Sequence, residues 1–104
     1  MLELTQKKHI EKVNSPVYFY ILELEDGNYY IGQSKEINHR ISKHFNGGGS
    51  AWTKVHKPIK VIKQWASSFT DWKEAETEEC RLTIECMIKY GWRNVRGGFW
   101  CNVD

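Results

Sequence analysis

The fold is decided by Val17-Tyr18-Phe19-Tyr20-Ile21-Leu22, a continuous run of β-branched, aromatic and aliphatic residues. Such a run predicts a strand that is buried on both faces. Asp26-Gly27 follows and is a strong hairpin turn signal. Asn28-Tyr29-Tyr30-Ile31-Gly32 then returns as a second strand. The two segments therefore predict an antiparallel hairpin.

A helix is predicted directly after the hairpin. Ser34 can cap a helix that begins near Lys35. Apolar residues then recur every four positions and give one stripe, formed by Ile37, Ile41 and Phe45. The glycine-rich segment 46–50 ends this helix in a flexible loop.

A third strand and a long second helix complete the regular structure. Pro58 precedes an apolar strand over residues 59–65. Asp71 and Glu74 fit a capping box, and the helix that they open runs to about Tyr90, where Gly91 stops it. The chain order is strand, strand, helix, strand, helix and an irregular end. This order predicts an α+β fold, with a small three-stranded antiparallel sheet flanked by helices.

Length and composition indicate one globular domain. The chain has 104 residues, of which 40% are hydrophobic, and this excludes a disordered chain. Because Asn14-Ser15-Pro16 reads as a breaker, we expect an N-terminal arm or short helix over 1–16 and a single domain over 17–104. The net charge is only +2, so binding to nucleic acid requires locally concentrated positive charge or help from another module.

The cysteines and the N-terminus indicate where the protein works. Three cysteines without a signal-peptide pattern argue against a secreted disulfide scaffold. The expected location is the cytoplasm, or the nucleus in a host that has one. Cys80 and Cys86 lie about 240° apart around their helix, which disfavours a shared zinc ion.

Glu79 stands out because it interrupts an apolar helical stripe. The other members of this inner stripe are Trp72, Ala75, Leu82, Cys86 and Tyr90. A carboxylate in this place faces the core or the edge of a cleft, and an unpaired buried charge is costly. Two explanations are open: Glu79 pairs with a basic side chain, or it binds a metal cation.

Four further residues have both an ordinary and a functional interpretation. Arg40 and His44 lie one helical turn apart, and this spacing fits either a solvated pair or a phosphate-binding arginine beside a proton acceptor. Tyr20 and Tyr30 lie on the two strands of the hairpin, where paired tyrosines usually serve packing.

Taken together, these residues resemble the GIY-YIG nuclease superfamily. The resemblance is carried by Tyr18-Phe19-Tyr20, Tyr30-Ile31-Gly32, Arg40, His44 and Glu79, in this order. The segment 47–53 and Pro58 also resemble members of that family. Tyr18 and Phe19 replace the glycine and isoleucine of the first motif, and neither side chain is expected to do chemistry.

The resemblance implies hydrolysis of a DNA phosphodiester with one divalent metal ion, Mg²⁺ or Mn²⁺. By position, the implied catalytic residues are Tyr20, Tyr30, Arg40, His44 and Glu79, with Glu79 as the metal ligand. An asparagine after the glutamate helix recurs in some members, so Asn94 is a further candidate and Asn102 a weaker one. A lysine or histidine after the first helix is also common, and Lys54 or His56 can serve.

The mechanistic hypothesis follows from this set. Tyr20 activates the attacking water, and either His44 accepts the phenolic proton or nearby cations lower the pKa of the tyrosine. Arg40 holds the phosphate, and Tyr30 positions the water or the phosphate. Gly32 lets the backbone approach the DNA. The products are a 5′ phosphate and a 3′ hydroxyl.

Some alternatives remain open. Arg93 and Arg96, in the C-terminal segment 93–100, either grip phosphate or accompany aromatic residues that cover the small core. A non-catalytic nucleic-acid-binding or protein-interaction module on the same scaffold is the alternative function. A second protein or a homodimer is a possible means of targeting, because no second DNA-binding domain is evident.

Overall fold

The computed structural model describes residues 15–98 and shows the predicted hairpin. Strands β1 (Tyr18–Leu24) and β2 (Asn28–Ser34) pair antiparallel, and the 3-10 turn η1 (Glu25–Gly27) joins them. Asp26 and Gly27 have φ angles of 59° and 74° in this turn. Aspartate and glycine tolerate such left-handed conformations, which is why Asp-Gly predicts the turn correctly.

The α+β fold class is confirmed, and the sheet is larger than expected. Strand β3 (Pro58–Ala66) pairs antiparallel with β1, while β4 (Val95–Gly97) pairs parallel with β2. The strand order is β3-β1-β2-β4, so the sheet is mixed and four-stranded rather than three-stranded and antiparallel. Strand β4 has three residues, including a glycine, and its pairing is a tertiary contact that a sequence pattern does not encode.

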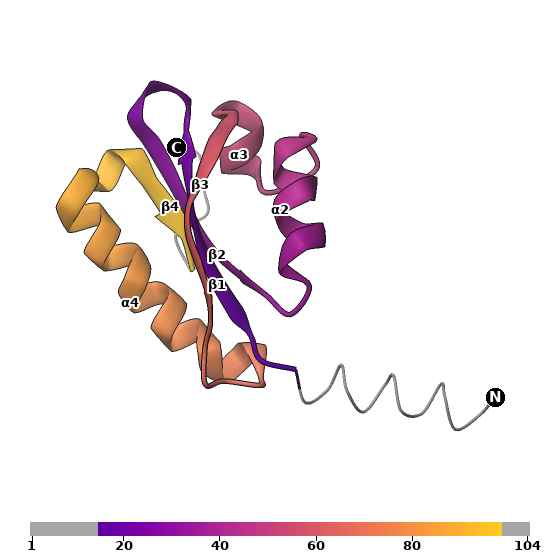
Figure 1. Ribbon diagram of the computed structural model, residues 1–104. Helices are drawn as coiled ribbons and strands as arrows, with labels where there is room; N and C mark the ends of the chain where they lie inside the picture. The colour runs from indigo at the N-terminus through magenta and orange to yellow at the C-terminus, as the bar shows by residue number, and fades with distance from the viewer. Residues whose placement is uncertain (1–14, 99–104) are drawn as a thin grey trace.

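The sheet lies between two helical layers (Figure 1). Helix α4 (Trp72–Tyr90) covers one face, and helices α2 (Ile37–Phe45) and α3 (Ala51–Val55) cover the other. Strand β1 alternates between these layers, because Tyr20 and Leu22 pack with Trp52 of α3, whereas Phe19 packs with Ala75 of α4. The prediction that β1 is buried on both faces is therefore confirmed. Each such large apolar side chain contributes about 1.5–3 kcal/mol by leaving water.

The helix boundaries differ from the prediction on the α2 side. Helix α2 begins at Ile37, and Ser34 Oγ accepts a hydrogen bond from the backbone N–H of Glu36 before it. Ser34 thus shapes the turn that precedes the helix instead of capping the helix itself. Helix α3 was not predicted. Its cap is Ser50, whose Oγ accepts a hydrogen bond from the N–H of Thr53.

Helix α4 has the predicted limits, but its stripe is shorter than expected. Asp71 caps it by accepting a bond from the N–H of Lys73, and Gly91 follows its last residue with a φ of 96°. Glu79 is buried as expected, whereas Trp72 is 56% exposed. The period of a helix fixes which residues share a face, but it does not fix how far along the helix the packed surface extends.

Two other large apolar residues near the ends of helices are also exposed. Phe45, the last residue of α2, is 42% exposed, so the stripe that it shares with Ile37 and Ile41 extends beyond the packed surface. Trp92, in the 3-10 helix η2 (Trp92–Asn94), is also exposed and does not cover the core. The predicted arm over 1–16, Asn102 and residues 99–100 lie wholly or almost wholly outside the described residues.

Candidate active site

A buried tyrosine–histidine pair forms the centre of the site. Tyr20 points from β1 toward α2, and its hydroxyl lies 2.8 Å from Nε2 of His44, the penultimate residue of α2. The two side chains are 1% and 0% exposed. Nδ1 of His44 lies 3.0 Å from Oγ1 of Thr53 in α3. Both ring nitrogens of His44 therefore have a polar partner inside the protein.

Glycines make room for this pair. A Cβ on Gly32, which is opposite Tyr20 in the hairpin register, would collide with the Tyr20 ring. A Cβ on Gly49 would collide with the imidazole of His44. Gly32 was predicted to allow the backbone to approach DNA, and the structure gives a second reason for a glycine there. Gly49 and Thr53 are support residues that the sequence analysis did not identify.

Tyr30 and Arg40 complete the surroundings of the pair. The ring centroid of Tyr30 lies 6.3 Å from that of Tyr20 and 5.0 Å from that of His44. Arg40, one turn before His44 on α2, acts on Tyr20 through a hydrogen bond and through its charge. Its charge also reaches His44 and Glu79. Arg40 is half-buried, whereas the other four predicted catalytic residues are buried.

Burial keeps the tyrosine–histidine pair neutral near pH 7. Burial raises the pKa of Tyr20 well above its usual range, and Tyr30 adds to this effect, although Arg40 opposes both. Burial, together with the charge of Arg40, lowers the pKa of His44 to about 4. Burial outweighs Arg40 in the protein without a metal ion, and a lowering of the Tyr20 pKa by a bound cation stays a prediction. The other expected route, in which His44 accepts the phenolic proton, is consistent with this geometry.

Glu79 approaches the site from the middle of α4. It is 8% exposed, and burial together with the charge of Glu76 raises its pKa to about 7. The backbone N–H of Gly98 donates a hydrogen bond to its carboxylate, and Arg40 also lowers the pKa. Of the two explanations considered for Glu79, pairing with a basic side chain is seen only as the charge effect of Arg40, and binding of a metal cation stays a prediction. Gly98 is another support residue that the sequence analysis did not identify.

The raised pKa of Glu79 predicts an unusual dependence of stability on pH. The folded protein holds this proton more tightly than the unfolded chain, whose pKa is about 4.5. Without divalent metal, the contribution of Glu79 to the free energy of unfolding should therefore be largest below pH 4.5 and should fall by up to about 3 kcal/mol as the pH rises toward 7, while the lowered pKa of His44 acts in the opposite direction. In Glu79→Gln this fall should be absent. Urea unfolding at pH 5 and pH 8 measures both proteins, and parallel pH profiles would contradict the assignment.

The environment of Glu79 fits one magnesium or manganese ion. Mg²⁺ usually keeps several waters and binds one or two carboxylates together with substrate phosphates. A single carboxylate that is buried without full charge compensation suits such an ion. It does not suit a closed metal cage, and residues 15–98 hold no group of three or more His, Cys, Asp or Glu able to share an ion.

The remaining predicted residues contact other parts of the protein than the Tyr20–His44 pair. Lys54 is exposed on α3, whereas His56 faces the Asn28 amide at 3.2 Å and the edge of the Trp52 ring. Asn94 donates to the carbonyl of Tyr90 at the end of α4. Their roles toward DNA stay predictions.

Two arginines near the C-terminal side differ in accessibility. Arg93 is exposed and lies over the ring of Trp92, with its guanidinium 5.2 Å from the ring centroid. Arg96 is 8% exposed, lies 4.5 Å from the centroid of Trp52, and donates to the carbonyl of Val95. The exposed Arg93 is therefore accessible to a ligand, whereas the buried Arg96 packs against the ring of Trp52. Binding of phosphate by either residue stays a prediction.

Comparison with known proteins agrees with this geometry. The model of the GIY-YIG catalytic domain matches residues 16–85, a range that includes Tyr20, Tyr30, Arg40, His44 and Glu79. The chain belongs to the GIY-YIG family. The resemblance noted from the ordered motifs is thus confirmed, and it extends over most of the chain.

Bacterial relatives of the chain carry the name UPF0213 protein. The one from Streptococcus pneumoniae serotype 4 is 37% identical over 65 residues, which are 62% of this chain and 64% of the relative. UPF0213 protein SSP2268 from Staphylococcus saprophyticus is 43% identical over 47 residues, which are 45% of this chain and 57% of the relative. The matched part of this GIY-YIG chain thus spans less than two thirds of these two relatives. No solved structure matches it.

No membrane-crossing helix is present in the described part of this GIY-YIG domain, since none of the helices within residues 15–98 is both long and apolar enough.

Proposed function

We propose that this chain is a metal-dependent DNA endonuclease that hydrolyses a phosphodiester to a 5′ phosphate and a 3′ hydroxyl. The observation that carries the proposal is the buried contact of 2.8 Å between the Tyr20 hydroxyl and Nε2 of His44, within reach of the Arg40 charge. Membership in the GIY-YIG family supports a catalytic role for this arrangement.

In this proposal Tyr20 is the general base for the attacking water. A phenol with a raised pKa does not ionise by itself near neutral pH, so its proton must leave during the reaction. Neutral His44 accepts that proton on Nε2 while the phenolic oxygen takes one from the water. The two proton transfers, from water to Tyr20 and from Tyr20 to His44, thus occur together, and no free phenolate has to form.

Arg40 supplies positive charge to the phosphate. Its guanidinium can donate two hydrogen bonds to phosphate oxygens and offset negative charge as the bond breaks. Its partial exposure makes it the first of the five catalytic candidates that an approaching phosphate meets. Tyr30, packed against the His44 ring, positions the water or the phosphate.

Glu79 would hold the divalent ion. A Mg²⁺ or Mn²⁺ ion bound there supplies Lewis acidity at the scissile phosphate. Glu79 would supply the carboxylate ligand. Its buried position in α4 and the hydrogen bond from the Gly98 N–H hold this carboxylate in place. The charge of the ion also removes the cost of an ionised buried carboxylate.

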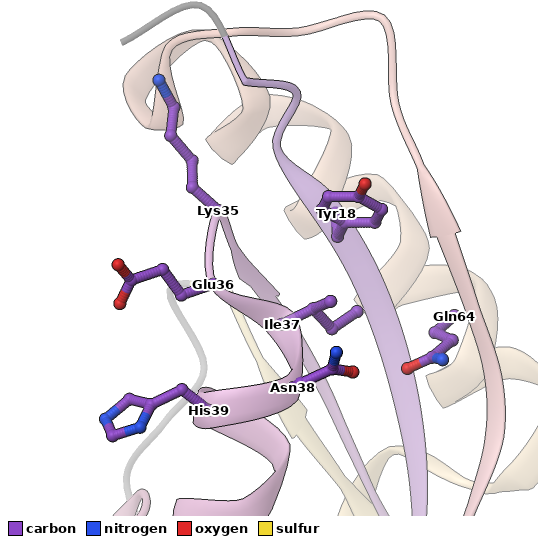
Figure 2. Close-up of a pocket in the computed structure, with 7 residues that line it drawn as sticks. All are labelled: Tyr18, Lys35, Glu36, Ile37, Asn38, His39 and Gln64. Atoms are coloured by element: carbon purple, nitrogen blue, oxygen red, sulfur yellow. The ribbon is translucent and has the colours of Figure 1, made fainter. Parts of the chain in front are cut away.

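An open hollow beside the site offers a path for DNA. It has a volume of about 680 Å³ and lies between the first turn of α2 and strands β1 and β3. Figure 2 shows Tyr18 and Gln64 on the strand side and His39 on the side of the helix. None of the lining residues is a catalytic candidate, but Gln64 is the β3 partner of Tyr20 and His39 precedes Arg40 in α2. We infer that the phosphate backbone approaches Arg40 from here.

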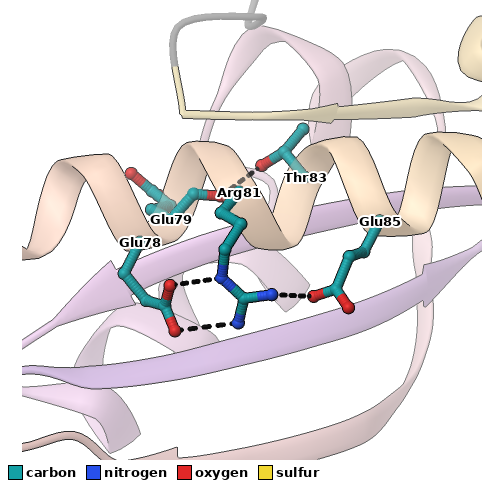
Figure 3. A network of polar contacts seen from close by, with 5 residues as sticks. All are labelled: Glu78, Glu79, Arg81, Thr83 and Glu85. Atoms are coloured by element: carbon teal, nitrogen blue, oxygen red, sulfur yellow. Dashed lines mark hydrogen bonds and ion pairs between the residues drawn. The ribbon is translucent and has the colours of Figure 1, made fainter.

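The experiment that tests the proposal compares Arg40→Ala with Arg81→Ala. Arg81 is a matched control, because it is an exposed arginine of α4 that bonds Glu78 and Glu85 and points away from Glu79 (Figure 3). With Mg²⁺, Arg40→Ala should cleave plasmid and branched DNA roughly 10²–10³-fold more slowly than wild type. Arg81→Ala should stay within about twofold, since exposed ion pairs contribute little. Equal rates for the two variants would contradict the role of Arg40.

A further inference from the structure

The tautomer of His44 decides whether it can accept the proton of Tyr20. A neutral imidazole carries its proton on one nitrogen, and only the other nitrogen can accept. Nε2 faces the Tyr20 hydroxyl, so the productive form carries its proton on Nδ1. In the opposite tautomer Nε2–H would donate to the Tyr20 oxygen, and Nε2 could not accept the phenolic proton. Something in the protein must therefore favour a proton on Nδ1.

The hydrogen bonds of Thr53 supply this preference. The Thr53 hydroxyl has one hydrogen, and its Oγ1 lies 3.1 Å from the backbone carbonyl of Ser50. A carbonyl can only accept, and when the hydrogen of Thr53 is donated to Ser50, a lone pair of Oγ1 faces Nδ1 of His44 at 3.0 Å. Ser50 Oγ lies 3.3 Å from Oγ1 and already accepts from the N–H of Thr53, so its own hydrogen is free to point toward Oγ1.

We infer that Thr53 is a positioning residue that holds His44 in the form protonated on Nδ1. The hydrogen bonds then run in one direction, from the Tyr20 hydroxyl to Nε2 of His44, from Nδ1–H to Thr53, and from the Thr53 hydroxyl to the Ser50 carbonyl. Thr53 is 1% exposed, so water does not replace its hydroxyl as an acceptor.

The short helix α3 explains how Thr53 is kept in this position. Ser50 caps α3 and binds both the backbone N–H and the hydroxyl of Thr53. Trp52, the neighbouring residue, anchors α3 in the core by donating its indole N–H to the carbonyl of Tyr29. Gly49 has no side chain, and this lets the preceding loop close over the His44 ring.

The arrangement also suits the protonated state of His44. When the Tyr20 proton moves to Nε2, the ring becomes an imidazolium with hydrogens on both nitrogens. Thr53 continues to accept from Nδ1–H, so no hydrogen bond has to reverse. The phenolic oxygen then passes the proton that it took from water to the leaving 3′ oxygen, which becomes the 3′ hydroxyl, and Tyr20 takes its own proton back from Nε2. This inference rests on the proposed function, in which His44 accepts that proton.

The test combines ¹⁵N NMR of the histidine rings with single-turnover cleavage of DNA. In wild type at pH 7, the His44 signals should show a protonated Nδ1 and an unprotonated Nε2. In Thr53→Val, which keeps the shape and removes the hydroxyl, this preference should be lost. The maximal cleavage rate should fall roughly 10–100-fold, while the DNA concentration at half-maximal rate stays unchanged. Thr53→Ser should restore both the tautomer and the rate.

The control is Thr77→Val, the same change at an exposed position of α4, and it should match wild type. The NMR measurement on wild type needs neither DNA nor a variant that folds. A proton on Nε2 would overturn the role of Thr53, whatever the activity is. Equal losses of rate in Thr53→Val and Thr53→Ser would overturn it as well. A protonated Nδ1 in a protein that cuts no DNA would support the tautomer and overturn only the proposed function.

Discussion

Glu79→Gln should abolish the metal-dependent cleavage of DNA, with a loss of about 10³-fold or more. Glu79 is the carboxylate that we propose as the ligand of the divalent ion, and Gln keeps its size while removing the negative charge. Lewis-acid stabilisation by a metal ion contributes several kcal/mol, and 1.36 kcal/mol corresponds to a tenfold change in rate. Single-turnover cleavage over a range of Mg²⁺ concentrations measures this effect.

Glu85→Gln is the matched control for this prediction. Glu85 lies on the same helix as Glu79, but it is exposed and bonds Arg81 (Figure 3). It should retain the rate of wild type and the same dependence on Mg²⁺. Glu79→Gln should still fold, because the neutral side chain avoids the cost of a buried charge. A fully active Glu79→Gln would show that the metal site lies elsewhere.

Tyr20→Phe should lower the cleavage rate by roughly 10²–10⁴-fold, the range that general-base catalysis contributes. The change removes only the hydroxyl that bonds Nε2 of His44. DNA affinity, measured with Ca²⁺ in place of Mg²⁺, should stay close to that of wild type. The free energy of unfolding should fall by about 1–3 kcal/mol, because the buried Nε2 loses its donor.

The control for Tyr20→Phe is Tyr29→Phe on the neighbouring strand. The ring of Tyr29 stacks on Tyr90 at 3.8 Å, and the substitution preserves this contact. The Tyr29 variant should cleave DNA at the rate of wild type. If Tyr20→Phe also kept that rate, the water would be activated by another group, and the tyrosine–histidine pair would be structural.

Local signals predicted the hairpin and the long helix well. The Asp26-Gly27 turn, the Asp71 cap and the Gly91 stop each depend on neighbouring residues, so their signals are present in a short window of sequence. Glu79 was recognised as unusual because it is a charged residue among the apolar residues of its helical stripe. The structure confirms that this carboxylate is buried.

Features that depend on tertiary contacts were missed. Strand β4 is too short to show a period, and it exists because Val95 and Gly97 pair with β2. Helix α3 follows a glycine-rich loop and contains five residues, of which Trp52 and Thr53 are buried. The partnership of Thr53 with His44 joins two helices across that loop. Only the spacing of Ser50 and Thr53, typical of a helix cap, hinted at it in the sequence.

The sequence predicted the members of the Tyr20–His44 pair, but not the protonation states that burial gives them. The order of Tyr20, Tyr30, Arg40, His44 and Glu79 indicated one site, and the electrostatic influence of Arg40 on Tyr20, His44 and Glu79 agrees with a shared location. The sequence did not reveal the depth of burial, which keeps Tyr20 protonated and His44 neutral. That depth works against the route through a lowered tyrosine pKa and favours the route in which His44 accepts the proton.

The most direct test of the central claim is to map the ends produced from labelled duplex, nicked, flap and branched DNA. The purified protein is incubated with each substrate with Mg²⁺ or with EDTA. We predict cleavage of at least one substrate only with Mg²⁺, leaving a 5′ phosphate that ligase can join and a 3′ hydroxyl that polymerase can extend. Absence of cleavage on every substrate, or products ending in a 3′ phosphate, would contradict the account.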